Sequence, residues 1–362
     1  MDMAIENGKE MRLMKGNEAL AEAAFRAGMK AYFGYPITPQ SEILEYLAFH
    51  APEHPDVVVL QAESELAAIN MVYGASGAGA RVMTSSSSPG ISLMQEGLSY
   101  MTSAHLPALI VNVQRGGPGL GTIQPSQSDY FQAVKGGGHG DYHLLVLAPA
   151  SVQEMVDFVF EGFRLSEKYR NPVMILADGA LGQMMEKVVL PPAGTLPKAD
   201  VSWASTGKPA ARERNIITSL FIQPEKMEMI NLGLQEKYKK MESEIRYELI
   251  ECNDAEIVLV AFGLTARICQ KVIELGREKG IKIGLVRPIT LFPFPYDILN
   301  RMADSVEAFL AVEMNAGQML EDVRLAVNGK KPVHFYGRTG GMIPSPEEVL
   351  RKVGAIIERV LV

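Results

Sequence analysis

Short apolar runs alternate with helix-rich segments through the first half of the chain, and this alternation constrains its fold more than any other feature. Strands are predicted at residues 31–34, 57–60, 80–84, 107–113, 144–149 and 171–178. Helices are predicted between them, at residues 17–28, from 39, from 65, from the serine run to 103, and at 151–169. Strand, helix and strand at this βαβ spacing predict an α/β fold, a mainly parallel sheet with helices on both faces.

Three of these helix ends carry capping signals. Gly28 is suited to end the first helix in the left-handed conformation. Either Thr38 or Ser41 is expected to cap the helix that follows Pro39. Ser151, with Glu154 three residues later, is expected to cap the helix that runs to Tyr169.

The character of the chain changes at Pro191-Pro192. Residues up to about 209 are rich in Pro, Ala and Gly, which predicts an irregular segment. Residues 224–251 are predicted as one long amphipathic helix. The apolar side of this helix would carry Met229, Leu232, Leu234, Tyr238, Met241, Ile245 and Leu249.

A second α/β unit begins at Ala255. Its strands are predicted at residues 257–262, 283–286, 308–312 and 333–336. The chain therefore divides into a first domain at residues 1–190, a connector with a long helix at 191–254, and a second domain at 255–362.

Composition excludes several classes of protein. A chain of 362 residues is long for one core, and its net charge of -7 argues against a non-specific nucleic-acid surface. The polar N-terminus does not resemble a secretory signal, and no apolar run reaches the roughly 18 residues of a membrane span. Cys252 and Cys269 are the only cysteines, too few for a four-thiolate iron–sulfur or zinc centre. We expect a reduced, cytoplasmic protein.

A single carboxylate, Glu65, opens a segment that is otherwise almost entirely apolar or small. Residues 66–69, 71 and 72 leave almost no polar face, so a buried helix is predicted. A carboxylate there is costly to bury unless a protein group or a ligand pairs with it. The alternative is a carboxylate that only complements the helix dipole. Glu63, two residues earlier, is expected to be structural.

Polar chemistry gathers where the predicted strands end. It occurs at residues 35–39, Glu65, residues 84–88 and Gln114-Arg115. In an open parallel sheet, ligands bind outside the carboxyl ends of the strands, so these four places are expected to meet at one edge. Structural alternatives stay open for three of them: a rigid double-proline connector, a helix start at the serine run, and a salt bridge for Arg115.

Three motif matches do not hold. Residues 117–121 lack the spacing of a dinucleotide fingerprint, and no clear helix follows them. His139 and His143 share a Gly-rich stretch without the Cys or acidic residues that would complete a metal set, so no metal ligands are predicted. Gly140-Asp141 faintly matches a diphosphate–magnesium signature, but Tyr142 stands where that signature needs a small residue.

Five stretches together carry a family resemblance. They are GYPITP at residues 34–39, the segment around Glu65, QRGGPG at 114–119, GTIQPSQSDYFQAVKGGGHGD at 121–141 and LVRPITLFP at 285–293. This combination resembles the α subunit of 2-oxoacid:ferredoxin oxidoreductases over nearly the whole chain. Among the branches, it is most similar to the 2-oxoisovalerate (3-methyl-2-oxobutanoate) type, with the 2-oxoglutarate type a close relative.

The resemblance implies a fold and a cofactor. Residues 1–190 would be the pyrimidine-binding domain of a thiamine diphosphate enzyme, and residues 255–362 a transketolase C-terminal-like domain. Glu65 would contact the aminopyrimidine ring of the cofactor. A carboxylate bonded to N1′ of that ring in an apolar site stabilises the imino tautomer, whose nitrogen can deprotonate C2 of the thiazolium.

The resemblance also assigns the remaining site residues. Tyr35, Pro36 and Ile37 would join Glu65 in binding the cofactor. Thr38 and Arg115 match family positions that hold the carboxylate and carbonyl of the substrate. An arginine fork opposite a planar carboxylate suits that role.

The family reaction is the oxidative decarboxylation of a 2-oxoacid with coenzyme A to acyl-CoA, carbon dioxide and reduced ferredoxin. The chain lacks the family's thiamine diphosphate–magnesium motif and its iron–sulfur cysteines. The resemblance therefore implies that a β-type partner subunit holds most of the thiamine diphosphate and Mg²⁺, and that iron–sulfur clusters lie only in partner subunits. Further partners would be γ-type and ferredoxin-like subunits and ferredoxin, with no nucleic acid and no membrane. The active site is expected to form between chains.

Two other functions stay open. A 2-oxoglutarate:ferredoxin oxidoreductase subunit would need a cation for the distal carboxylate of its substrate. A non-catalytic small-molecule-binding or scaffold subunit would keep the fold without the chemistry, although Glu65, Thr38 and Arg115 are all present.

Overall fold

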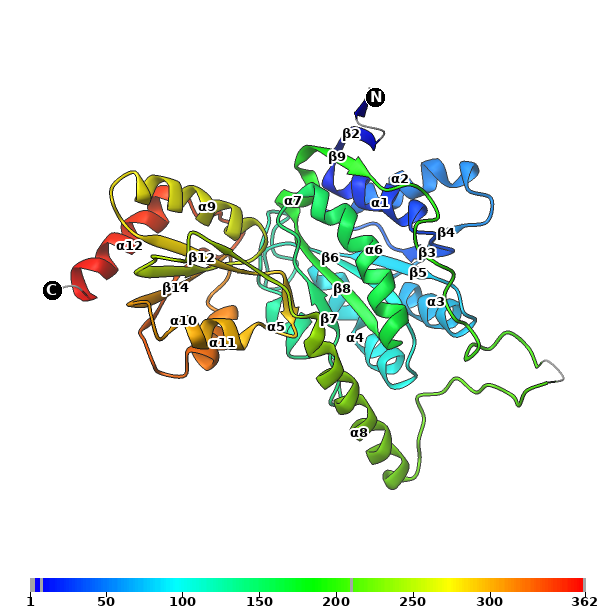
Figure 1. The fold of residues 1–362 in the computed structure, drawn as a ribbon. Coiled ribbons are helices and arrows are strands. Elements are labelled where there is room, and N and C mark those ends of the chain that lie inside the picture. The colour runs from blue at the N-terminus through cyan, green and yellow to red at the C-terminus, as the bar shows by residue number, and fades with distance from the viewer. Residues whose placement is uncertain (1–3, 7–8, 209–210, 361–362) are drawn as a thin grey trace.

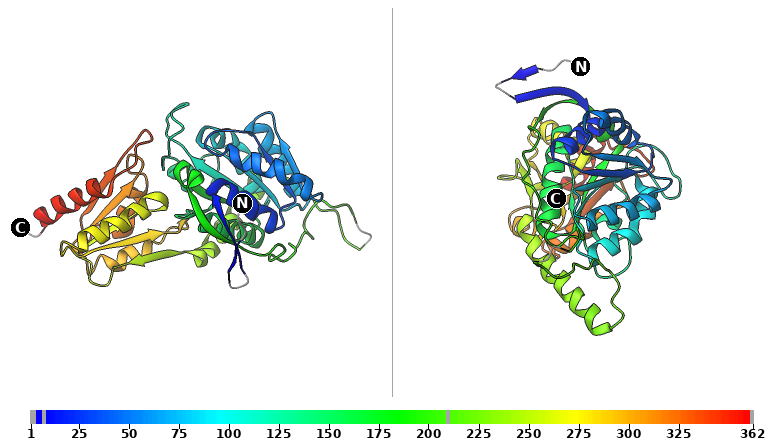
Figure 2. Two further views of the ribbon diagram at one scale, coloured as in Figure 1. Left: turned by 90° about the horizontal axis from the view of Figure 1, so that it is seen from above. Right: turned by 90° about the vertical axis from the view of Figure 1, so that its right-hand side faces the viewer.

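The computed structural model describes residues 4–6, 9–208 and 211–360. These residues form two α/β lobes side by side, and helix α8 (Pro224–Met241) projects from the larger lobe (Figure 1). The C-terminal helix α12 (Pro346–Val360) lies on the outer side of the smaller lobe (Figure 2). No helix within the described ranges is both long and apolar enough to cross a membrane.

A seven-stranded sheet forms the centre of the first lobe, in the order β13-β7-β8-β6-β5-β3-β4. Six strands run parallel: β3 (Ala31–Gly34), β4 (Val58–Gln61), β5 (Val82–Ser86), β6 (Ala108–Gln114), β7 (Leu145–Leu147) and β8 (Pro172–Asp178). The predicted parallel sheet is therefore confirmed. The seventh strand, β13 (Thr290–Phe292), comes from the second α/β unit and pairs antiparallel with β7. This pairing between the two α/β units was not predicted from the sequence.

Helices cover both faces of this sheet, as predicted. The helices α1 (Gly16–Arg26), α2 (Ser41–His50) and α6 (Val152–Tyr169) pack on one face, and α3 (Glu65–Gly77) and α4 (Ser88–Ser103) pack on the other. Side chains of β6 alternate between these two cores, since Leu109 and Val111 belong to one core and Ile110 to the other. Two short helices, α5 (Tyr130–Val134) and α7 (Gly179–Gln183), complete the lobe.

One face of α3 is exposed, so the prediction of a fully buried helix is wrong for that face. Ala68, Ile69 and Val72 are fully buried against the sheet. Leu66 is 48% exposed and Met71 is 37% exposed on the other side. The apolar composition is present, but no element within the described residues covers that side of the helix.

A five-stranded sheet forms the second lobe, in the order β10-β12-β11-β14-β15. The strands are β10 (Tyr247–Ile250), β11 (Ile257–Val260), β12 (Ile283–Pro288), β14 (Ala308–Glu313) and β15 (Val333–Gly337). Helices α9 (Gly263–Arg277) and α12 cover one face, and α10 (Tyr296–Met302) and α11 (Met319–Val327) cover the other. The core beneath α10 and α11 continues into the core beneath α3 and α4, which joins the two lobes.

The helix predicted at residues 224–251 is wrong in its second half. Helix α8 ends at Met241, a 3₁₀ turn (Glu242–Glu244) follows, and residues 247–250 form β10, antiparallel to β12. Edge pairing with β12 satisfies the backbone of these residues better than a helix end in solvent would. On α8 itself, Leu234, Tyr238 and Met241 are buried as predicted, whereas Met229 and Leu232 are 71% and 61% exposed.

A small antiparallel sheet, also not predicted, covers one end of the first lobe. It consists of β1 (Ala4–Glu6), β2 (Lys9–Lys15) and β9 (Met185–Leu190), in that order. Residues 191–223 contain no regular element within their described part, as the Pro-rich texture predicts.

Two of the three predicted caps are confirmed. Gly28 has a φ of +79°, and its N–H donates to the carbonyl of Phe25. The Ser151 hydroxyl accepts from the N–H of Glu154 at 3.1 Å. The third prediction is wrong, because α2 begins after Gln40 without a side-chain cap.

Candidate active site

Polar segments from four neighbouring strands, β6, β5, β3 and β4, meet at the carboxyl edge of the first sheet, as predicted. Arg115, after β6, donates from Nη1 to the carbonyl of Thr38, after β3, at 2.9 Å. Ser86, at the end of β5, donates to Oε1 of Glu65 at 3.4 Å. Ser88 Oγ accepts from the Arg115 N–H at 3.0 Å. These contacts form because β6, β5 and β3 are adjacent in the sheet and run in the same direction.

Glu65 is a buried carboxylate with little hydrogen bonding. It lies in the first turn of α3, where Ser64 caps the helix by accepting from the N–H of Ala67 at 3.2 Å. Glu65 is only 5% exposed, and Ser86 at 3.4 Å is its only hydrogen-bond donor among the described residues. Most of its acceptor capacity is therefore unused, which is costly for a buried carboxylate unless a donor arrives from outside the chain. Glu63 is exposed.

Gly90 leaves the space that the carboxylate occupies. A Cβ on Gly90 would lie 2.4 Å from Oε1 of Glu65 and 2.1 Å from Oγ of Ser86. Because no side chain fits at these distances, Gly90 allows the first turn of α4 to approach the Glu65 carboxylate closely.

Arg115 is a buried guanidinium without a carboxylate partner among the described residues. It is 9% exposed, and its Nη1 and Nη2 donate to the carbonyls of Thr38 and Leu120 at 2.9 and 3.1 Å. Its Nε is buried without any hydrogen-bond acceptor. The salt-bridge alternative for Arg115 is therefore not realised within the described chain, and its charge is available to an anion.

The serine run after β5 is more than a helix start. Ser85 donates to Oε1 of Gln40 at 2.6 Å and contacts the hydroxyl of Tyr32 at 2.7 Å. The hydroxyls of Thr84 and Ser87 are buried and have no hydrogen-bond partner in the described part of the chain. Buried hydroxyls without partners are unusual in a single core and commonly mark a site that a ligand or another chain completes.

The double-proline loop is exposed beside this site. Tyr35, Pro36 and Thr38 are exposed and Ile37 is half-buried, while the Gln40 side chain fixes the loop by donating to the carbonyl of Tyr35 at 3.2 Å. Large apolar side chains are exposed on the loop and on neighbouring elements, at Tyr35, Leu60, Leu66, Met71, Leu93 and Leu120. We call these six residues the mouth face.

A cleft of about 790 Å³ opens between the two lobes next to Arg115. Its first-domain wall carries Ser88, Arg115, the Gly-rich loop at 116–119 and Asp129, and its second-domain wall includes Asn315 and Gln318. Arg115 is the single cationic side chain among the described residues that line it. The cleft is large enough for a small organic substrate.

Several polar residues of this region were missed by sequence reasoning. Asp129 accepts from Ser88 Oγ at 2.6 Å and from Asn112 Nδ2 at 2.9 Å, and burial raises the pKa of its carboxyl. Gln127 is buried and bonds to the second domain. The available signal was the run QPSQSD at residues 124–129, which places five polar side chains directly after the Gly-rich loop.

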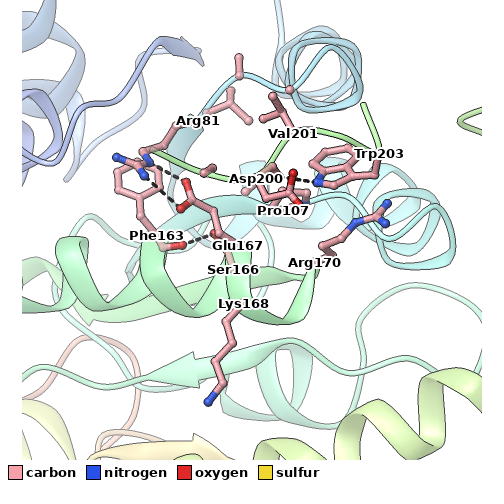
Figure 3. A pocket seen from close by; sticks show the side chains of 15 residues that line it. Arg81, Pro107, Phe163, Ser166, Glu167, Lys168, Arg170, Asp200, Val201 and Trp203 are labelled. Atoms are coloured by element: carbon pink, nitrogen blue, oxygen red, sulfur yellow. Dashed lines mark hydrogen bonds and ion pairs between the residues drawn. The ribbon is translucent and has the colours of Figure 1, made fainter. Parts of the chain in front are cut away.

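A second pocket lies at the opposite, amino-terminal edge of the first sheet (Figure 3). Arg81 makes a bidentate ion pair with Glu167 at 2.6 and 3.0 Å, and Arg170 stacks over Trp203 at 4.2 Å. Its volume is about 230 Å³. Because this pocket lies far along the strands from Glu65, it is not part of the candidate active site, and its ion pair and stack serve to hold the start of the connector.

The two histidines of the Gly-rich stretch have ordinary packing contacts. His139 packs edge-on against Tyr100, and His143 stacks on Phe292 at 4.2 Å. Among the described residues, no group of three or more His, Cys, Asp or Glu side chains is arranged to hold a metal ion.

Comparison with known families defines the class of this protein. Residues 22–254 match the family model described as pyruvate flavodoxin/ferredoxin oxidoreductase, thiamine diphosphate-binding. Residues 255–349 match pyruvate:ferredoxin oxidoreductase core domain II. A split-gene transketolase (inactive β4 tetramer) has the same fold, with a TM-score of 0.61 at 14% identity over 96% of this chain and 98% of that one. The matched families define the chain as a subunit of a thiamine diphosphate-dependent oxidoreductase.

Individual relatives indicate which branch of this class the chain resembles. Ketoisovalerate oxidoreductase subunit VorB of Methanothermobacter thermautotrophicus is 50% identical over 343 residues, which cover 94% of this chain and 97% of that protein. 2-Oxoglutarate synthase subunit KorA of Methanocaldococcus jannaschii is 35% identical, with 95% and 99% covered. The structure of 2-oxoglutarate:ferredoxin oxidoreductase from Magnetococcus marinus, with 2-oxoglutarate, coenzyme A and succinyl-CoA bound, matches with a TM-score of 0.84 at 28% identity. That match covers 97% of this chain, which spans 66% of the solved chain.

The chain belongs to the 2-oxoacid:ferredoxin oxidoreductase family and is an α-type subunit of its ketoisovalerate type. The resemblance recognised in the sequence is thereby confirmed. The subunit names of the relatives imply a multi-subunit complex, and the family uses thiamine diphosphate and iron–sulfur cofactors.

Proposed function

We propose that this chain supplies half of a thiamine diphosphate site that oxidatively decarboxylates 2-oxoisovalerate and similar branched-chain 2-oxoacids. Coenzyme A would accept the acyl group, and ferredoxin the electrons. The observation that carries the proposal is the buried carboxylate of Glu65, which accepts only one long hydrogen bond, from Ser86, among the described residues and lies at the same edge of the sheet as Arg115. The division into residues 1–190, 191–254 and 255–362 is part of the proposal.

Glu65 would act on the pyrimidine side of the cofactor. When bound, thiamine diphosphate supplies the carbon nucleophile and the electron sink that decarboxylation of a 2-oxoacid requires. Ser86 donates one hydrogen bond to the Glu65 carboxylate and leaves its other acceptor sites free. One of these sites would accept a hydrogen bond from the aminopyrimidine ring. Burial of Glu65 strengthens that bond, because the surroundings have a low dielectric constant.

Arg115 and Thr38 would hold the substrate, and Tyr35, Pro36 and Ile37 would contact the cofactor from the exposed loop. The Arg115 fork, already fixed by the carbonyls of Thr38 and Leu120, would bind the 2-oxoacid carboxylate without reorganising.

Branched-chain substrates fit the charge of the cleft better than 2-oxoglutarate. 2-Oxoglutarate carries two carboxylates and needs a second cation, whereas Arg115 is the only cationic side chain among the described residues that line the cleft. The higher identity to the VorB relative supports the same choice, because the KorA relative is more distant.

The remaining parts would come from partners in the cytoplasm. A β-type subunit would hold the diphosphate and Mg²⁺ and cover the mouth face, whose apolar side chains are exposed in this chain. The γ-type and ferredoxin-like subunits would hold the iron–sulfur clusters, because the two cysteines here are free, and one is fully buried.

The test is an assay of the complex reconstituted with its partner subunits. We expect the highest kcat/KM with 2-oxoisovalerate when it is compared with 2-oxoglutarate, pyruvate and an aryl 2-oxoacid. Glu65→Gln should lower turnover by about 10²–10⁴-fold, the usual contribution of a positioned acid–base group. Unchanged turnover in Glu65→Gln would instead support a non-catalytic scaffold role.

A further inference from the structure

Residues 124–131, which we call the bridge segment, connect the backbone of Arg115 to the second domain. At the start of the segment, the N–H of Gly116 donates to the carbonyl of Gln124 at 3.0 Å, and Arg115 and Pro125 form an antiparallel bridge. The backbone of Arg115 is therefore held on one side by this segment, directly before the Gly-rich loop.

Gln127 attaches the bridge segment to the second domain. Its Nε2 donates to the carbonyl of Phe262 at 2.8 Å, and its Oε1 accepts from the Met314 N–H at 3.0 Å and lies 3.1 Å from the Thr265 hydroxyl. Its carbonyl accepts from Asn315 Nδ2 at 2.8 Å. Gln127 is 1% exposed, so all these bonds are shielded from water. Such a network fixes the segment relative to the second domain.

Asp129 links the far end of the segment back to Arg115. Ser88 Oγ lies 2.6 Å from Oδ2 of Asp129 and 3.0 Å from the backbone nitrogen of Arg115. The Ser88 hydroxyl has one proton, which it donates to the Asp129 carboxylate in the shorter of the two contacts. Ser88 thus donates to Asp129 and accepts from Arg115, while Asn112 Nδ2 donates to the same carboxylate oxygen at 2.9 Å.

We propose that Asp129 is a positioning residue for Arg115, and that through Asp129 and Gln127 the second domain sets the place of the substrate-binding guanidinium. The inference rests on the proposed role of Arg115 in holding the 2-oxoacid carboxylate. No carboxylate among the described residues holds this guanidinium, so its location depends on its backbone and on two carbonyls. Displacement of that backbone by about 1 Å is enough to cost on the order of 100-fold in reactivity.

The experiment measures kcat and KM for 2-oxoisovalerate in the reconstituted complex. Ser88→Ala and Asp129→Ala should each raise KM about tenfold and lower kcat less than about threefold, since they loosen the binding of the carboxylate. Gln127→Ala should also raise KM. Asp129→Asn should stay close to the wild-type KM, because its amide oxygen still accepts from Ser88.

The hydrogen bonds of Asp129 explain why the asparagine variant should keep the wild-type KM. Ser88 and Asn112 donate to the same oxygen of Asp129, so an asparagine whose amide oxygen takes that place accepts both hydrogen bonds, while alanine accepts neither. The matched control is Ser166→Ala, which removes a fully buried hydroxyl that donates to the carbonyl of Phe163 on α6, away from the cleft. Its KM should equal that of the wild type.

Two results would overturn the inference. One is an unchanged KM in both Ser88→Ala and Asp129→Ala. The other is a loss of activity that follows thermal stability and also occurs in Ser166→Ala. If Asp129→Ala does not fold, Ser88→Ala still tests the connection between Asp129 and Arg115, because Asp129 keeps its hydrogen bond from Asn112 in that variant. Arg115→Lys separates the two proposals: a raised KM there with a normal KM in Ser88→Ala rejects only the positioning role, whereas an unchanged KM in Arg115→Lys rejects the proposed role of Arg115 itself.

Discussion

Gly90 is the position at which an added side chain would most directly displace the Glu65 carboxylate. In an ordinary helix, replacing Gly with Ala stabilises by roughly 1 kcal/mol, because glycine loses more backbone freedom on folding. Here the new Cβ would meet the Glu65 carboxylate and the Ser86 hydroxyl, so overpacking of about 1–3 kcal/mol opposes that gain. For Gly90→Ala we expect a small net change in Tm but a loss of turnover of at least about tenfold in the reconstituted complex.

Gly233, in the interior of α8, provides the comparison for this variant. A Cβ there would have no neighbour within 4 Å. Gly233→Ala should therefore raise Tm slightly and leave turnover unchanged. Full activity in Gly90→Ala would mean that the carboxylate tolerates displacement, and would weaken its assignment as the catalytic acid–base group.

Site residues differ in how far the sequence reveals them. The segments that contain Glu65, Thr38 and Arg115 were predicted to meet because each follows a strand and parallel strands bring their carboxyl ends together, and the family resemblance then implied the roles of the three residues. Asp129 and Gln127 were missed. Gln127 bonds to Phe262 and Met314, more than a hundred positions away in the chain, and no local pattern indicates such partners.

Helix α8 is anchored to the first lobe by a half-buried lysine, Lys237. Lys237 Nζ lies 3.0 Å from Nδ1 of His105, and it donates to the carbonyl of Arg170 and to Oδ1 of Asn171 at 3.1 and 3.2 Å. Burial, with the charge of Arg170, lowers the pKa of Lys237 from 10.5 to about 7. Burial and the neighbouring cations lower the pKa of His105 to about 4. Both groups are thus disfavoured as cations in the folded chain.

This anchor predicts a pH dependence of stability. Between pH 7 and about 10.5, the unfolded chain binds more protons at Lys237 than the folded chain does, so this group makes the free energy of unfolding rise with pH. Thermal unfolding from pH 6 to 9 should therefore show a rising Tm in the wild type above pH 7. Lys237→Met should remove much of that slope. The Tm of this variant, relative to the Tm of the wild type, should be highest near pH 6–7.

Lys239, two residues further along α8, tests whether the slope belongs to Lys237. It is 68% exposed at its side chain and pairs with Glu236. Lys239→Met should keep the wild-type slope. A slope that persists in Lys237→Met would assign it to another group.

Helices and strands were predicted well where one periodicity dominated the sequence. They were predicted poorly where pairing with a distant strand determines the secondary structure. The parallel strands and their helices are present close to the expected positions. Residues 245–250 were read as the end of a helix, although Tyr247 and Leu249 alternate with Glu248 in a strand pattern. Pairing with β12 selects the strand, and only the folded second domain provides β12.

At the scale of the whole molecule, the two lobes are packed together, whereas the mouth face of the first lobe is exposed. Tyr130 of the first lobe lies 5.7 Å from Phe262 of the second, ring centre to ring centre, and donates to Asp322 at 2.7 Å. Lys135 and Tyr296 bond to the same carboxylate. The lobes are thus joined by a buried core and a satisfied polar network, whereas the mouth face has no cover within the described chain.

Leu66 allows that open side to be tested without disturbing the fold. It is 48% exposed and lies in the first turn of α3, where a carboxylate is favoured by the helix dipole. Leu66→Asp should therefore leave the Tm of the isolated chain nearly unchanged, within about 0.5 kcal/mol in unfolding free energy. In a partner-bound state the same aspartate would be buried in an apolar contact, which costs several kcal/mol, so the affinity for the β-type subunit should fall at least about 100-fold.

Size-exclusion chromatography and titration with the partner subunit measure this effect directly, independently of catalysis. Leu325→Asp is the matched control, because Leu325 is 65% exposed on α11 of the second lobe, away from the mouth face. It should change neither Tm nor assembly. If Leu66→Asp assembled as tightly as the wild type, the mouth face would not be the partner-binding surface. If it lowered Tm as much as it lowered affinity, the exposed side of α3 would serve the fold of this chain and not its assembly.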